Sequence, residues 1–269
     1  KTNPPMPTTA GDKRQTPDTE TQSRKDPSNP KRHKRVSGHA IVPWQDFVTA
    51  RKQLLEEEKR LGREMLDLAK KRQQLPWREV SEDYKFEGVD GKKVNFSDLF
   101  KHSSNTLVVY HFMFDPEWSK GCGTCSCWAD CLNGCFPHIS QRCDIVLVAK
   151  ANNPKLADFV KSKGWSIPAY SSFGSKFNQD FRVEFTSEEM KSKEKVYNFG
   201  SSTFPYAKQA PGMSVFQKHE GKLYHTYSTY GPGLVTLNAM FGVIDMIPAG
   251  RDESGKRNMW WVKHREEYE

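Results

Sequence analysis

The sequence predicts an α/β fold, a three-layer sandwich with a mixed central sheet. Two continuous runs of β-forming apolar residues, Thr106–Phe114 and Asp144–Ala149, are typical of strands buried on both faces of a sheet. An amphipathic helix at Pro154–Gly164 follows the second run. Two further strands, Met213–Phe216 and Leu223–Tyr227, are separated by a turn that contains glycine and predict a hairpin. Strands that alternate with helices and end in a hairpin indicate helices packed on a mixed sheet.

Shorter patterns predict the remaining elements. Residues 84–96 alternate apolar and polar side chains on either side of a Gly-Val-Asp-Gly turn, which predicts a hairpin. A short helix is expected to begin at Ser97, which can act as its N-cap. A third strand at Trp165–Tyr170 and a final helix at Leu234–Met246 complete the prediction. Residues 171–209 show no pattern that orders them.

Residues 1–40 differ in composition from the rest of the chain. They hold six of the sixteen prolines and only four apolar residues, so they cannot bury enough surface to offset chain entropy. We expect a disordered arm, and its nine Lys and Arg against four Asp and Glu make it basic. The basic run Lys31–Arg35 is either a nuclear address or a solvated charge cluster.

Residues 41–76 form a second region, an amphipathic helix that spans residues 45–73. Pro43 precedes this helix and Pro76 ends it, both at positions where proline is tolerated. We expect the apolar stripe of the helix to dock on its own domain, which makes the protein a monomer. The alternative is a coiled-coil seam between two copies, which makes it a dimer. The stripe recurs every seven residues: Phe47, Leu54, Leu61 and Leu68.

The cysteines are concentrated in one part of the chain. All six fall in the 22-residue window that runs from Cys122 to Cys143. A secreted domain held by disulfides would distribute its cysteines to close loops along the chain. The clustering therefore predicts local thiol chemistry, either redox or metal.

The first two cysteines, Cys122 and Cys125, form a Cys-x-x-Cys motif between a buried strand and the expected start of a helix. Helix N-terminal amides and the helix dipole stabilise a thiolate at that place. We therefore expect an exposed Cys122 that attacks a disulfide and a deeper Cys125 that resolves the mixed disulfide.

Two other interpretations of the cysteines stay open, namely ordinary buried thiols and a zinc or iron–sulfur site. Cys127, Cys131 and Cys135 recur every four residues and form one stripe on a helix, which cannot enclose a tetrahedral ion without folding back. We therefore expect no metal, and we interpret the stripe as small core residues. Cys127 is close enough to Cys125 in sequence to act as a spare resolving thiol, and Cys143 is expected to be inert.

The order of strands, cysteine motif, helices and terminal hairpin resembles the thioredoxin fold. More closely, residues 40–269 resemble the thioredoxin-like family catalogued as domain of unknown function 899, whose members are predicted dithiol–disulfide oxidoreductases. This resemblance assigns residues 77–269 to a thioredoxin-like domain. It is carried by these stretches: Leu75-Pro76-Trp77, Tyr84–Gly88, Tyr110–Phe114, Cys122 with Cys125-Ser126, Trp128-Ala129-Asp130, Pro211–Phe216, His225–Tyr230 and Gly250-Arg251-Asp252.

The resemblance implies roles for single residues. Cys122 resembles the nucleophile and Cys125 the resolving thiol. Pro211 resembles the cis-proline that faces the active site of thioredoxins. His111 lies on the strand where thioredoxins bury an acidic residue that assists proton transfer, and it is either a proton-transfer group or a satisfied core histidine. Trp128 belongs to a matching motif and is a further auxiliary candidate.

The motif also departs from thioredoxins, because Gly121 precedes the first cysteine and Gly123-Thr124 separate the pair. The stretch Pro116–Cys122 is similar to the peroxiredoxin loop, although Ser119 lies in a register one residue short. A thiol peroxidase is therefore the alternative enzyme, and a cysteine-rich metal-binding or partner-binding module is the alternative outside enzymology.

Charge and hydropathy limit the partners. Residues 41–269 carry 32 Lys and Arg against 29 Asp and Glu, a balance that argues against nucleic-acid binding by the folded part. There is no apolar run long enough to span a membrane and no visible secretory signal, so we expect a cytoplasmic protein. With no dinucleotide signature, we expect no cofactor and a thiol or disulfide substrate, either a protein or a small molecule.

Overall fold

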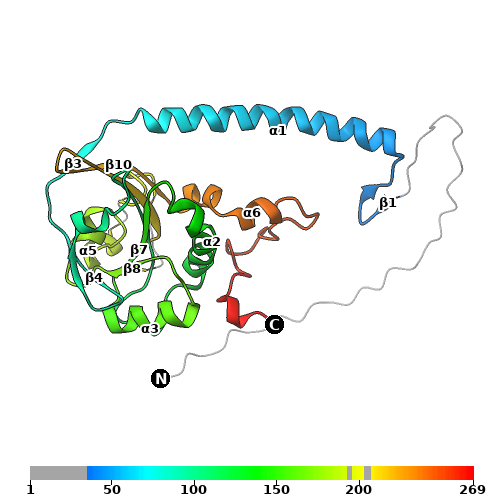
Figure 1. The fold of residues 1–269 in the computed structure, drawn as a ribbon. Helices are drawn as coiled ribbons and strands as arrows, with labels where there is room; N and C mark the ends of the chain where they lie inside the picture. Colours follow the sequence, from blue (N-terminus) through cyan, green and yellow to red (C-terminus); the bar gives the residue numbers. More distant parts are fainter. Residues whose placement is uncertain (1–34, 193–195, 203–206) are drawn as a thin grey trace, which may run out of the picture. The chain divides into compact units, whose positions relative to one another are not determined.

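The computed structural model describes residues 35–192, 196–202 and 207–269 (Figure 1). Most of the predicted disordered arm and most of the run Lys31–Arg35 lie outside the described residues. The chain divides into two compact units, one ending at Asp67 and one that spans Leu68–Glu269. The two units are described separately.

The described part of the first unit contains a small hairpin and most of a long helix. Strands β1 (Arg35–Val36) and β2 (His39–Ala40) pair antiparallel. These two strands, joined by a tight turn, lie in residues 35–40, at the end of the range that the sequence assigns to the disordered arm. Helix α1 (Trp44–Gln73) confirms the predicted helix, and none of its described residues is buried. Whether its stripe docks or forms a seam stays a prediction.

The second unit is built on an eight-stranded mixed sheet with the order β3-β10-β9-β6-β7-β8-β4-β5. Strand β6 pairs parallel with β7, and β7 pairs parallel with β8. Strands β9 and β10 form an antiparallel hairpin that joins the other edge of β6. This arrangement is the thioredoxin-like α/β fold that the sequence predicts. The strands are β3 (Arg78–Val80), β4 (Lys85–Gly88), β5 (Lys93–Asn95), β6 (Thr106–His111), β7 (Asp144–Ala149), β8 (Ala169–Ser171), β9 (Gly212–His219) and β10 (Lys222–Tyr230).

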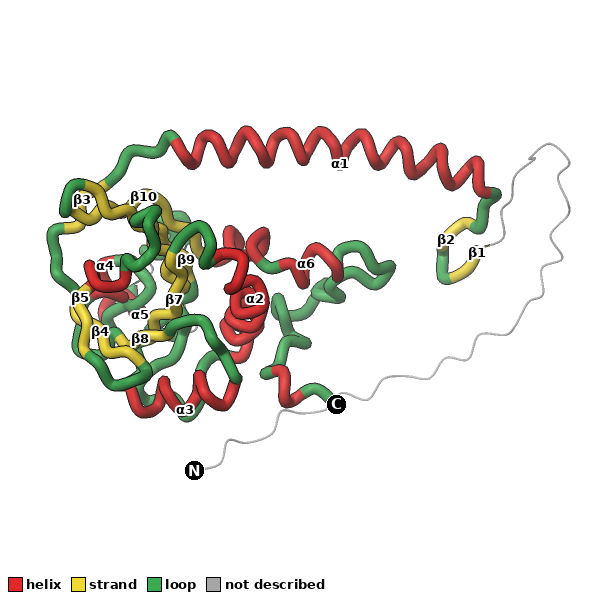
Figure 2. Tube along the Cα trace, in the orientation of Figure 1, coloured by secondary structure: helices red, strands yellow, loops and turns green. Residues whose placement is uncertain are grey.

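Helices complete the unit and lie beside the sheet (Figure 2). The α-helices are α2 (Gly123–Ile139), α3 (Asn153–Lys163), α4 (Phe177–Asp180), α5 (Ser187–Lys191) and α6 (Ala239–Ile244). The 3₁₀ helices are η1 (Phe96–Leu99), η2 (Gly231–Leu237) and η3 (Arg265–Glu267). The predicted C-cap of α3 is confirmed, because Gly164 adopts φ 61°, a left-handed conformation that glycine adopts without strain.

Four predicted elements differ from the structure. The strand expected at Trp165–Tyr170 is β8, which covers only Ala169–Ser171. The strand that starts at Thr106 ends at His111, because the next position of the β6–β9 ladder faces Pro211, which has no N–H to donate. The predicted helix at 234–246 is two helices, because the side chain of Asn238 accepts a hydrogen bond from Met240 N and starts a new helix there. The short helix expected from Ser97 begins one residue earlier, with Asn95 as its N-cap.

The two faces of the sheet bury separate apolar clusters. Side chains alternate along β6, so Tyr110 packs into the cluster that contains Trp128 of α2 and Leu156 of α3. Val109 packs on the opposite face with Phe96 and other aromatic rings. Helices α2 and α3 therefore cover the same face of the sheet, and that face carries the cysteines.

Candidate functional site

The loop between β6 and α2 presents the cysteine pair at the start of a helix. Cys122 is the N-cap of α2, and its backbone N–H donates to Met113 O at 3.0 Å. Gly121 permits this close approach, because a Cβ at that position would lie 2.6 Å from the Phe112 ring and 3.0 Å from Phe159. A side chain at position 121 would therefore push the loop away from the sheet.

The sulfur of Cys122 is surrounded by hydrogen-bond donors. Cys125 N donates to Cys122 Sγ at 3.5 Å, and Thr124 Oγ1 lies 3.0 Å from the same sulfur. The side-chain hydrogen bond from Cys125, opposed by burial and helped by Thr124, lowers the pKa of Cys122 to about 6. The thiolate of Cys122 is therefore the main form at neutral pH.

Cys125 lies one turn deeper and differs from its neighbour. It is only 2% exposed, within the apolar cluster beneath α2. Its hydrogen bond to Cys122, together with burial, raises the pKa of the Cys125 thiol well above its usual range. Tyr110 of β6 donates its hydroxyl to Cys125 O at 3.4 Å. The pair thus combines an ionised thiol, half-buried rather than exposed as the sequence predicts, with a protonated, buried thiol below it.

The structure does not bring His111 to the cysteines. Its side chain lies on the opposite face of the sheet, where the ring stacks 6.3 Å from Phe181. His111 Nε2 is 2.8 Å from Ser214 Oγ, and burial lowers the pKa of His111 to about 3. Because side chains alternate along a strand, the residue that faces the cysteines is Tyr110, one position earlier.

Pro211 lies immediately before β9, as expected, but the resemblance to a cis-proline is wrong. No peptide bond in the described ranges 35–192, 196–202 and 207–269 is cis. The carbonyl oxygen of Pro211 accepts a hydrogen bond from the hydroxyl of Tyr197. That hydroxyl also accepts from Gly231 N at 2.8 Å, so Tyr197 ties the start of β9 to the start of η2.

The other two auxiliary candidates face the last helices of the domain. Cys127 Sγ lies 3.5 Å from Met240 Sδ and 3.7 Å from Asn238 Nδ2. Trp128 is buried, and its Nε1 donates to Leu234 O at 3.1 Å. Both side chains therefore hold η2 and α6 against α2.

The remaining cysteines do not form the buried stripe that the sequence predicts. Cys131 is half-buried and Cys135 is exposed, because this face of α2 turns toward solvent near its C-terminal end. Cys143 is half-buried, and burial raises the pKa of its thiol. All six cysteines are free thiols. In the part of the chain that the structure describes, no group of three His, Cys, Asp or Glu side chains is placed to hold a metal ion.

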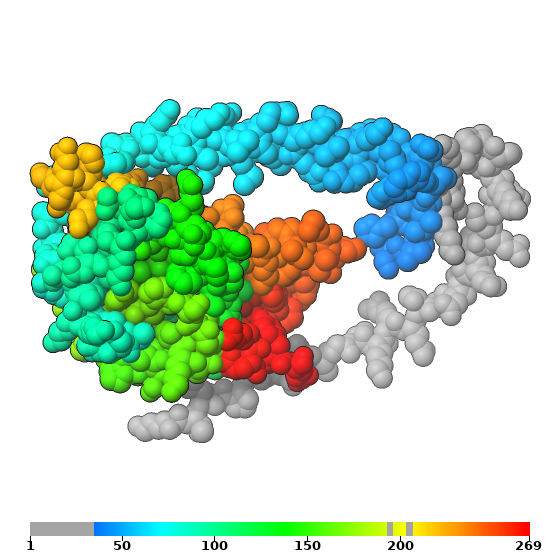
Figure 3. All heavy atoms as spheres, in the orientation of Figure 1, coloured from blue at the N-terminus to red at the C-terminus, as the bar shows by residue number. Residues whose placement is uncertain are grey.

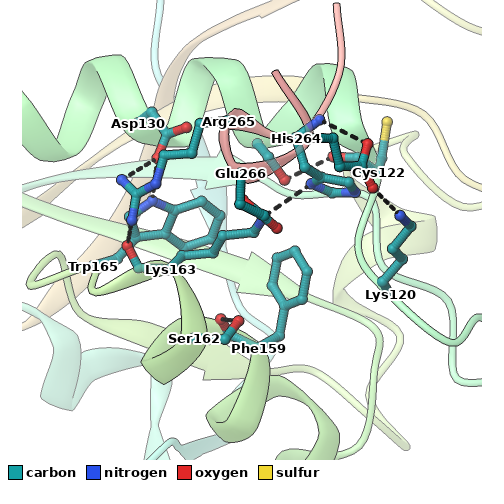
Figure 4. A network of polar contacts seen from close by, with 12 residues as sticks. Lys120, Cys122, Asp130, Phe159, Ser162, Lys163, Trp165, His264, Arg265 and Glu266 are labelled. Carbon is teal, nitrogen blue, oxygen red and sulfur yellow. Dashed lines mark hydrogen bonds and ion pairs between the residues drawn. The ribbon is translucent and has the colours of Figure 1, made fainter. Parts of the chain in front are cut away.

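Sequence reasoning missed the C-terminal residues that lie beside the start of α2. Figure 4 shows His264 near Cys122, Arg265 near Asp130 and Glu266 near Lys163. The only sequence signal is the run Lys263–Glu267, which looks like an ordinary solvated cluster of charges.

A separate cavity of about 610 Å³ contains no cysteine. Polar side chains of β3, α4 and nearby loops line it, among them Arg78, Tyr84 and Asp180. The hydroxyl of Tyr84 donates to Asp180 Oδ2 at 2.7 Å within it. The size of this cavity therefore does not identify the place of the thiol chemistry. None of the helices that the structure describes is both long and apolar enough to cross a membrane.

Residues 36–268 match the family described as "Bacterial protein of unknown function (DUF899)", so the chain belongs to that family. No curated protein matches the chain. Several solved structures are similar at low identity. A peroxiredoxin Q mutant of Xanthomonas campestris has 12% identity and a TM-score of 0.43, and the match covers 64% of this chain and 97% of that one.

Two other solved structures are similar to the same degree. For the peroxidoxin BcpB of Mycobacterium tuberculosis the identity is 14%, the TM-score is 0.40, and 58% of this chain and 85% of that chain are covered. For an uncharacterized thioredoxin-like protein of Porphyromonas gingivalis the identity is 12% and the TM-score is 0.37, and the match covers 63% of this chain and 92% of that chain.

Proposed function

We propose that this member of the DUF899 family is a dithiol–disulfide oxidoreductase that uses Cys122 and Cys125. The observation that carries the proposal is the opposite perturbation of the two thiols. Cys122, at the N-cap of α2, has a pKa lowered to about 6, whereas the pKa of buried Cys125 is raised well above its usual range. An exchange reaction needs this pairing, because one thiol must attack as a thiolate while the other stays protonated until its turn.

The reaction has two steps. The thiolate of Cys122 attacks one sulfur of a substrate disulfide, the substrate S–S bond breaks, and its electron pair leaves on the other substrate thiolate. Cys125 then loses its proton and attacks Cys122 Sγ in the mixed disulfide, which releases the second substrate thiol. The products are the Cys122–Cys125 disulfide and two substrate thiols. A dithiol reductant restores the enzyme by the reverse exchange.

The substrate class follows from this chemistry. A substrate disulfide can oxidise the cysteine pair, and a substrate thiol can reduce it, without a bound cofactor. The partner is therefore a protein or a small molecule that carries a disulfide or a thiol. We propose that the folded domain acts without nucleic acid or membrane.

Mass spectrometry of the oxidised protein tests the pairing. Mild oxidation with diamide should give one disulfide, between Cys122 and Cys125. Cys122→Ser should abolish reduction of a disulfide substrate, whereas Cys125→Ser should trap mixed disulfides on Cys122. A disulfide that joins Cys122 to Cys127 would contradict the assignment. Faster turnover of hydrogen peroxide than of any disulfide would favour the thiol peroxidase instead.

A further inference from the structure

The C-terminal segment Val262–Glu267 packs against α2 and α3, next to Gly123 at the start of α2. Figure 3 shows the C-terminal atoms in red against the body of the domain. Arg265 forms an ion pair with Asp130 of α2 at 3.0 Å and also donates to the carbonyl oxygen of Lys163 at the end of α3. These contacts fix the segment across the N-terminal half of α2 and the C-terminal end of α3.

The segment buries His264 next to a buried lysine. His264 is 3% exposed and Lys163 is 1% exposed. Lys163 Nζ lies 3.0 Å from His264 Nδ1 and forms an ion pair with Glu266. An ammonium group has three donors and no acceptor, so Nδ1 must accept. The imidazole proton of neutral His264 is therefore on Nε2.

The Nε2 edge of the ring faces the start of α2. A Cβ at Gly123 would lie 3.7 Å from His264 Nε2, and Gly123 directly follows Cys122. Figure 4 shows the His264 ring beside Cys122. Among the residues that the structure describes, none forms a hydrogen bond with Nε2. This nitrogen is thus a donor without a partner among the described residues, held beside the residue that directly follows Cys122.

Burial and the neighbouring lysines keep the His264 ring neutral. Lys163 comes from α3, Lys120 from the loop before Cys122, and Glu266 and Glu267 from the segment itself. Burial, followed by the two lysines, lowers the pKa of His264, although the two glutamates oppose this effect. At neutral pH the imidazole therefore acts as a hydrogen-bond donor rather than as a cation.

We propose that His264 is a catalytic residue whose Nε2–H donates a hydrogen bond to the substrate thiolate that leaves when Cys122 attacks, and that Lys163 is the positioning residue that fixes its tautomer. This inference rests on the proposed exchange function. The electron pair of the broken S–S bond goes to the leaving sulfur, and solvent supplies its proton. The start of α2 already stabilises the attacking sulfur of Cys122 through Cys125 N and Thr124. The leaving sulfur has no share in those donors and needs one of its own.

Two substitutions separate this role from packing. His264→Asn keeps an acceptor near Nδ1 for Lys163 but removes the donor at Nε2. His264→Gln places a side-chain N–H near Nε2 and loses the acceptor. Exchange should be measured with two substrates, hydroxyethyl disulfide, which releases a basic alkyl thiolate, and dithiobis(nitrobenzoate), which releases a delocalised aryl thiolate. The alkyl thiolate depends more on a hydrogen bond, because its charge is localised on sulfur.

We expect His264→Asn to slow exchange with hydroxyethyl disulfide by about tenfold and to have a much smaller effect with dithiobis(nitrobenzoate), since a hydrogen bond to a charged group is worth about this much. His264→Gln should recover most of the loss. The exposed His219, substituted by Asn, is the matched control and should exchange at the wild-type rate with both substrates.

Alkylation of Cys122 by iodoacetamide is a second control, because iodide needs no hydrogen bond to leave. Equal losses with both disulfides, or a Gln variant as slow as the Asn variant, would overturn the role of His264. A wild-type protein that alkylates at Cys122 yet exchanges with neither disulfide would instead overturn the proposed function, and the inference with it.

Discussion

The two ends of α2 carry cysteines of different character. At the N-terminal end, Cys122 caps the helix, accepts hydrogen bonds from two neighbouring residues, and has a pKa lowered to about 6. At the C-terminal end, Cys135 is exposed and faces solvent. The same helix therefore presents one activated thiol at its first turn and one solvent-exposed thiol near its end. The difference shows that position on the helix, rather than the number of cysteines, creates the reactive group.

The largest effect should come from replacing the Cys122 thiol by a hydroxyl. Cys122→Ser should reduce disulfide exchange to the uncatalysed background, because a serine hydroxyl does not ionise at neutral pH and cannot attack. Cys135→Ser is the matched control and should exchange at the wild-type rate. Timed alkylation read by mass spectrometry should show Cys122 modified first, since about nine-tenths of it is thiolate at pH 7 when its pKa is about 6. Uniform labelling of all six thiols would remove the difference between the two ends.

A second comparison uses a glycine near each end. Gly121→Ala should lower the free energy of unfolding by about 1–3 kcal/mol, because its Cβ would lie 2.6 Å from the Phe112 ring in a packed core. Gly134→Ala, inside α2 with nothing within 4 Å of the added Cβ, should raise it by about 0.5–1 kcal/mol. Urea unfolding of both variants measures this. If Gly121→Ala were as stable as the wild type, the loop would not be packed as described.

A third, smaller effect concerns pH. Thr124→Val removes a hydrogen bond that favours the Cys122 thiolate, so the pKa of Cys122 should rise from about 6 toward its usual value. The thiolate is the reactive form, so the alkylation rate falls as pH drops through this pKa, and in the variant it should fall at a higher pH. Ser140→Ala removes a hydroxyl at the other end of α2 and should leave the profile in place. An unmoved midpoint in Thr124→Val would show that the hydroxyl does not contribute.

The smallest effect should come from Cys127, which lies between the two ends. Its sulfur contacts Met240 and Asn238, so Cys127→Ser should change exchange by less than about twofold while slightly lowering the free energy of unfolding. Steady-state exchange and thermal unfolding measure the two quantities. A loss as large as that of Cys125→Ser would mean that Cys127 resolves the mixed disulfide.

Local patterns predicted much of the fold. The run Asp144–Ala149 forms β7 with the predicted bounds, because the five consecutive apolar residues after Asp144 have few alternatives to a buried strand. The Gly164 C-cap was predictable, because the left-handed conformation favours glycine. Strand β3 was not predicted, since Arg78–Val80 is a strand only by pairing with β10, more than a hundred residues later.

The candidate site divides in the same way. The sequence alone determined the cysteine motif and its place between a strand and a helix, because the spacing of two residues and the helix start are local properties. Only the tertiary structure decided that Tyr110 rather than His111 faces the cysteines, since that depends on which face of β6 the helix α2 covers. It also decided that His264 lies beside Gly123, a contact between residues far apart in the chain. Such contacts depend on how the elements pack together, and no local pattern encodes them.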